Sequence, residues 1–118
     1  MNKPIIIKVA DLIGNPNAIS AEDGQKVFEK IKVFINDDKK VTLSFERVKI
    51  LISLFLNVAI GQLYGFFSEE EIREKLQVDD LAGDDLELLK RVVDNAKRYY
   101  SDPKPYDEAW SQVGEGNE

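Results

Sequence analysis

The segment from Val41 to Gly65 constrains the fold more than any other part of the chain. It opens with an apolar, β-branched run, residues 41–45, whose composition is typical of a buried strand. Residues 53–66 follow as an apolar stretch without charge, and Ser53 lies at the junction. Because a buried strand, a turn and a buried helix form one unit of an α/β sandwich, the pattern predicts an α/β protein.

The same apolar stretch raises the alternative of a membrane-spanning helix. Residues 50–67 carry no charge, and their length reaches the range in which such a helix must be considered. The β-branched composition before Ser53, however, leaves a helix of only about 13 residues, which covers about 20 Å. A hydrocarbon core of about 30 Å is thicker than that. We therefore predict no membrane span and, because residues 1–11 do not resemble a signal peptide, a cytoplasmic location.

The remaining elements follow from caps, turns and periodicity. Ser20 and Ser68 each precede acidic residues and are expected to cap helices. Residues 11–19 contain the sequence GNPN and are predicted to form a loop. Further strands are expected at residues 5–9 and 76–78, a closing or extending segment of the second strand at 48–51, and a last helix at 86–100.

Composition limits the possible chemistry. The 118 residues include no cysteine and no histidine, which excludes disulfides, thiolate nucleophiles and zinc sites built from these residues. The net charge is −6, and residues 101–118 hold five acids and one base. We expect one domain over residues 1–100 and an acidic, flexible tail over 101–118. No basic stripe is present, so nucleic acid is not an expected partner.

The acidic pairs Asp79-Asp80 and Asp84-Asp85 raise the question of a metal site. Their spacing does not match a calcium-binding EF-hand loop. Acids before a helix commonly serve as caps and as partners of the helix dipole. We therefore predict no metal and no cofactor.

Several segments, taken in order and spacing, resemble the STAS-like domain family of unknown function that occurs in bacterial and phage proteins. They are SAEDG at residues 20–24, LSFERV at 43–48, residues 55–65 with Asn57 and Gly61, and LLKRVV at 88–93. The resemblance covers about residues 18–100. It implies a single domain with a small mixed sheet and helices packed on it, as in anti-sigma-factor antagonists.

In antagonists of that type, a partner kinase phosphorylates a serine at the start of the helix that follows the central strand, and the phosphate breaks the complex. The matching residue is Ser53. This chain has Ile52, Leu54 and Ser44 where the pattern usually has an aspartate, a small residue and a strand aspartate. Such apolar neighbours are expected to shield Ser53 from a kinase. The alternative role for Ser53 is that of a helix N-cap.

Two further sets of residues are candidates for binding. Asn57 and Gly61 continue the line of Ser53 at helical spacing, so the three form a small, polar strip. The strip is either open to a partner or a close contact with a neighbouring helix. Tyr106 and Trp110 lie four residues apart and could form a short amphipathic helix that docks on this domain or on a partner.

The sequence favours a non-catalytic regulatory or adaptor module that binds another protein reversibly. By resemblance, the partner is an ATPase-type kinase or another regulatory factor. One alternative is a phage-encoded inhibitor that acts through its acidic tail. Another is an enzyme built from carboxylates alone, for which no spacing in the chain predicts a converging site. The oligomeric state does not follow from the sequence.

Overall fold

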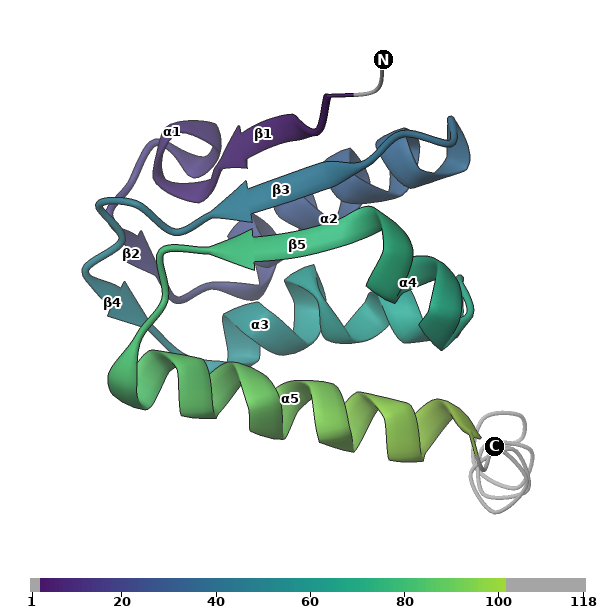
Figure 1. Cartoon of the computed structure of the whole chain (residues 1–118). Helices are drawn as coiled ribbons and strands as arrows, with labels where there is room; N and C mark the ends of the chain where they lie inside the picture. The colour runs from purple at the N-terminus through teal and green to yellow at the C-terminus, as the bar shows by residue number, and fades with distance from the viewer. Residues whose placement is uncertain (1–2, 102–118) are drawn as a thin grey trace, which may run out of the picture.

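The computed structural model describes residues 3–101, which form one α/β unit (Figure 1). In chain order its elements are β1 (Ile5–Lys8), α1 (Val9–Ile13), β2 (Asn17–Ala18), α2 (Ala21–Asn36), β3 (Val41–Ser44), β4 (Ile50–Leu51), α3 (Ser53–Ala59), the 3₁₀ helix η1 (Gly61–Gly65), α4 (Glu69–Lys75), β5 (Leu76–Asp79) and α5 (Gly83–Ser101). This order confirms the predicted α/β class with helices on a small sheet.

The main sheet has the strand order β1-β3-β5, and both pairings are parallel. Its three strands are the three that the sequence predicts. Side chains alternate across the sheet, so that Ile7, Leu43 and Val78 share the inner face while Ile6 and Gln77 lie on the outer face. Figure 1 shows α2 behind the sheet, α3 below strand β5, and no helix across the front of the sheet.

A second sheet, the parallel pair β2-β4, was not predicted. Residues 48–51 were expected to close or extend β3, but the chain reverses after it: Arg47 has φ 66° and the Val48 amide donates to the Phe45 carbonyl over 3.0 Å. Residues 11–19 are likewise more ordered than the predicted loop. They contain the end of α1, which Gly14 closes at φ 69°, and then β2.

Helix α2 agrees with its predicted start. The Ser20 hydroxyl accepts from the Asp23 amide over 3.0 Å, as the cap predicts. The stripe of α2 is buried at Val27, Phe28 and Ile31. Ser68 caps α4 in the same way, through the Glu71 amide at 3.1 Å.

The apolar stretch after Ser53 is not one helix, because α3 ends at Ala59 and η1 begins at Gly61. The Gln62 side-chain amide donates to the Val58 carbonyl over 2.8 Å. That carbonyl would accept from the Gln62 backbone amide in a continued α-helix, so the side chain competes with the helix. Within residues 3–101, none of the helices has both the length and the apolarity that a bilayer crossing requires.

Gly24 sets the distance between α2 and α3. A Cβ atom at this position would lie 2.8 Å from the Phe55 carbonyl oxygen and 3.0 Å from the Val58 Cβ. We expect Gly24→Ala to lower the free energy of unfolding by about 1–3 kcal/mol, because the two helices must move apart. Chemical denaturation measures this, and Lys30→Ala on the exposed face of α2 should change it by less than about 0.5 kcal/mol. A Gly24→Ala protein that is more stable than the parent would contradict the close packing.

Candidate functional site

The carboxyl ends of β1, β3 and β5 lie together at one end of the molecule (Figure 1). Because each returning helix starts where a strand has ended, the first turns of α2, α3 and α5 lie near this end too. In open parallel sheets, binding sites occur outside the carboxyl ends of the strands. This end of the molecule is therefore where a binding site is expected.

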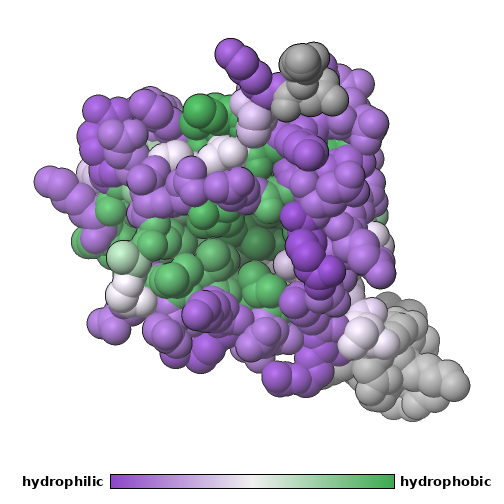
Figure 2. All heavy atoms as spheres, in the orientation of Figure 1, coloured by the Kyte–Doolittle hydropathy of each residue, from purple (hydrophilic) through white to green (hydrophobic). Residues whose placement is uncertain are grey.

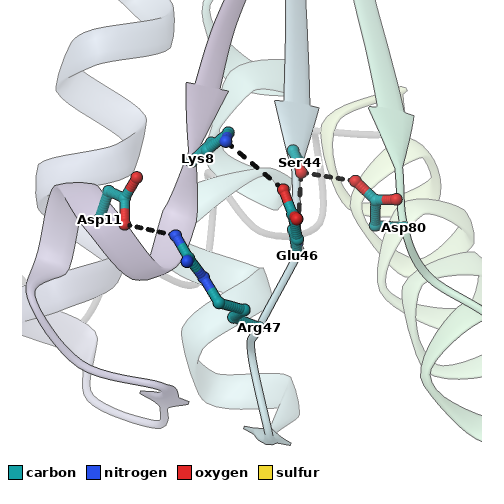
Figure 3. A network of polar contacts seen from close by, with 6 residues as sticks. All are labelled: Lys8, Asp11, Ser44, Glu46, Arg47 and Asp80. Atoms are coloured by element: carbon teal, nitrogen blue, oxygen red, sulfur yellow. Dashed lines mark hydrogen bonds and ion pairs between the residues drawn. The ribbon is translucent and has the colours of Figure 1, made fainter.

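A network of polar contacts joins the loops that follow the three strands (Figure 3). The Ser44 hydroxyl donates to Asp80 over 2.5 Å and accepts from the Glu46 amide at 3.2 Å. The Lys8 ammonium lies 3.5 Å from Glu46. Ser44 is 5% exposed, so its hydroxyl is satisfied inside the protein and holds the β3 and β5 loops together.

A separate ion pair in Figure 3 joins Arg47 to Asp11 at 3.2 Å, and both side chains are largely exposed. Lys39 and Lys40 precede β3 whereas Arg47 and Lys49 follow it, so the basic residues near this strand do not form one patch.

The two acidic pairs, Asp79-Asp80 and Asp84-Asp85, do not form one cluster either. Asp84 and Asp85 belong to the first turn of α5 rather than to a loop, and in residues 3–101 no three acidic side chains converge on a metal position.

Ser53 is exposed, and so are the apolar residues on both sides of it: Ile52 by 38% and Leu54 by 49%. The expected shielding of Ser53 is therefore wrong. The N-cap role is wrong as well, because Ile52 is the N-cap of α3 and no side chain caps this helix. Ser53 occupies the first helical position, and its hydroxyl has no hydrogen bond to any part of residues 3–101.

The neighbours of Ser53 belong to an apolar surface that the β2-β4 pair creates. Ala18 and Leu51 are paired and point into the core, so Ile19 and Ile52 point outward by strand alternation. The Ile52 amide donates to the Ala18 carbonyl over 3.3 Å, which continues this pairing. We call the exposed residues Ile19, Ile50, Ile52 and Leu54 the Ser53 patch; they are 42%, 50%, 38% and 49% exposed. The sequence gives no signal for this patch, because Ile50, Leu51 and Ile52 are all apolar and do not alternate with polar residues.

Asn57 and Gly61 lie on the side of α3 and η1 that faces α5. Both line a cavity of about 370 Å³ with Asn95, Arg98 and other residues of the second half of α5. Gly61 is buried, and a Cβ atom there would lie 3.7 Å from the Ala96 Cβ, whereas Asn57 is exposed. The structure thus places Gly61 in close contact with a helix and leaves Asn57 open. The other two candidates, Tyr106 and Trp110, lie outside the described residues.

Several ionisable groups have shifted pKa values, each away from neutrality. A hydrogen bond from Lys97 lowers the pKa of Glu69 below its usual value, and the same contact raises the pKa of Lys97. Lys75 lowers the pKa of Asp38, and Asp38 in turn raises the pKa of Lys75. Burial raises the pKa of Tyr64. Because a general acid or base needs a pKa near the operating pH, these shifts fit ion pairing rather than proton transfer.

The family follows from the sequence itself. Residues 23–86, which are 64 of the 118 residues, match the family described as a STAS-like domain of unknown function. The chain belongs to this family. The match begins just after the cap of α2 and ends in the first turn of α5. The matched region therefore includes the central strand, the cavity wall formed by Asn57 and Gly61, and every residue of the Ser53 patch except Ile19. No curated protein and no solved structure matches the chain.

Proposed function

We propose that this STAS-like domain is a non-catalytic regulatory module that binds another protein through the Ser53 patch. The observation that carries the proposal is the grouping of four large aliphatic side chains, each 38–50% exposed, at one end of the molecule. Contiguous exposed apolar residues mark protein-binding surfaces. Covering each of these side chains would contribute up to about 1.5 kcal/mol, since burying a whole Leu or Ile contributes about 1.5–3 kcal/mol.

The regulation that we propose is phosphorylation of Ser53 by a kinase, after the pattern of anti-sigma-factor antagonists. Support comes from the exposure of Ser53 at the edge of the patch and from its hydroxyl, which makes no hydrogen bond within residues 3–101. A phosphate would add nearly two negative charges to a surface whose partner must be apolar. Desolvating that charge is costly, so the modified protein would release its partner.

The partner in this scheme is an ATPase-type kinase or another regulatory factor. The absence of an enzymatic role is part of the proposal. Its support is that the acids at the strand ends are engaged, Asp80 with Ser44, Glu46 with Lys8 and Asp11 with Arg47. Each of these three carboxylates therefore already has a polar partner within the described residues.

The test compares two substitutions of the same serine. The immobilised protein captures its partner from a lysate of the native host, mass spectrometry identifies the partner, and the dissociation constant is then measured with purified proteins. Ser53→Asp should weaken binding by at least about tenfold, or 1.4 kcal/mol, while Ser53→Ala should keep it within about twofold. An acid at the first turn of a helix is favourable, so the Asp variant should remain folded.

Ser101→Asp is the matched control, since Ser101 is an exposed serine at the far end of α5. It changes the net charge equally and should leave binding unchanged. Equal affinity of the Ser53→Asp and Ser53→Ala proteins would remove the switch. An equal loss of affinity in the Ser101→Asp protein would mean that the change in net charge alone causes the effect.

A further inference from the structure

A hollow lined with apolar residues lies between strand β5 and helix α5, and Figure 2 shows it as the green area below the strand. We call it the β5–α5 groove and define it by Ile60, Ile72, Leu76, Val78, Leu89 and Val93, which line a cavity of about 230 Å³. Ile60, Ile72 and Leu89 form its buried part, and Leu76, Val78 and Val93 remain half-buried.

Among residues 3–101, β5 pairs only with β3, so it is an edge strand of the described sheet. An edge strand beside an apolar surface is an aggregation hazard that proteins normally cover. No element of residues 3–101 covers the groove. A cover for the groove would have to come from the rest of the chain or from another molecule.

The described chain ends at the mouth of the groove. Ser101, its last residue, lines a second cavity together with Tyr64, Glu69 and Lys97, and the same three residues also line the groove. The two hollows are therefore continuous along α5. The chain beyond Ser101 starts where it can enter the groove without crossing the protein.

The length and charge of the following segment suit this path. Val93 lies eight residues before Ser101, about 12 Å along the helix, and four extended residues cover that distance. Tyr106 is the fifth residue after Ser101, and Trp110 is four further on. The rim of the groove holds two cations, Arg73 and Lys97, against the single acid Glu69, and residues 102–118 have a net charge of −4.

We infer that residues 102–113 fold back along α5 and insert the rings of Tyr106 and Trp110 into the β5–α5 groove of the same chain. Two aromatic side chains would supply a large apolar area to cover the groove, since each can bury about 150–250 Å². The same inference pairs the acids Asp107 and Glu108, which stand between the two aromatic residues in the sequence, with Arg73 and Lys97 at the rim. The segment covers the edge of β5 and leaves the Ser53 patch free.

The experiment uses the fluorescence of Trp110, the single tryptophan of the chain. In the full-length protein its emission should be blue-shifted, and the acrylamide quenching constant should be at least about twofold below that of N-acetyltryptophanamide, with no dependence on protein concentration. Val93→Glu places a charge in the groove and should raise the constant toward the free value. Val33→Glu is the matched control, on a 60% exposed valine of α2, and should not change it.

A second measurement avoids any change in the folded domain. Replacing Tyr106 and Trp110 with alanine should open the groove and increase the fluorescence of the apolar dye ANS at least about twofold. An accessible Trp110 at every concentration would overturn the proposal. If Trp110 is shielded from acrylamide only at concentrations at which a dimer forms, a second copy of the chain occupies the groove. If Val93→Glu leaves the shielding of Trp110 unchanged in a folded protein, Trp110 lies elsewhere. Either result would also overturn the proposal.

Discussion

Replacing Phe55 with alanine is expected to lower the free energy of unfolding by about 3–5 kcal/mol, the range for deleting a buried aromatic side chain. Phe55 lies in α3 and is completely buried. Its own carbonyl oxygen would lie only 2.8 Å from a Cβ atom placed on Gly24 of α2. Because the two helices touch at the backbone here, they cannot approach further to fill the cavity. The loss should therefore fall toward the upper end of the range.

Equilibrium denaturation in urea, followed by circular dichroism, measures this change. Single domains are stable by about 5–15 kcal/mol, so the variant should unfold at a much lower urea concentration. Leu54→Ala is the control: Leu54 is the preceding residue but is 49% exposed, and its loss should be below about 1 kcal/mol. A Phe55→Ala loss under about 1.5 kcal/mol would mean that α3 is not packed as described.

Local chemistry explains why much of the fold was predictable. The β-branched runs became β1 and β3 because their side chains suit a buried sheet. The two serine caps were predictable because a hydroxyl accepting from an amide three residues later needs only local geometry. The long amphipathic helices α2 and α5 follow from periodicity over many residues.

The elements that the sequence did not predict are those set by tertiary contacts. Strands β2 and β4 have two residues each, too few for a period to appear, and each forms only because the other lies beside it. Helix α1 has five residues, which is also below the length that periodicity can reveal. The break before η1 depends on one side chain, Gln62, competing for a carbonyl.

The same division applies to the candidate site. The position of Ser53 after β4 could be predicted from the strand–helix junction, but its surroundings could not. Its apolar neighbours suggested burial, because an apolar residue in a sequence carries no mark of the face on which it lies. The β2-β4 pairing decides that face: it turns Leu51 inward and Ile52 outward. An unpredicted pair of strands therefore makes Ser53 accessible.

The second large effect concerns binding alone. Ile52→Asp should weaken the complex with the captured partner by at least about 2 kcal/mol, roughly thirtyfold, because central apolar residues dominate protein interfaces and the new carboxylate would be desolvated there. The fold should not suffer. Ile52 is the N-cap of α3 and lacks a capping side chain, and Asp is among the best residues at that position, worth about 0.5–2 kcal/mol.

Ile52→Asp thus separates the two properties: the protein should unfold at the same or a higher temperature while it loses its partner. Isothermal titration with the purified partner and thermal unfolding measure the two effects. Val33→Asp, on the exposed side of α2, carries the same charge change and should bind normally. If Ile52→Asp retains full affinity in a folded protein, the Ser53 patch is not the contact surface. A lower unfolding temperature would instead show that Ile52 supports α3 through packing that its 38% exposure does not suggest.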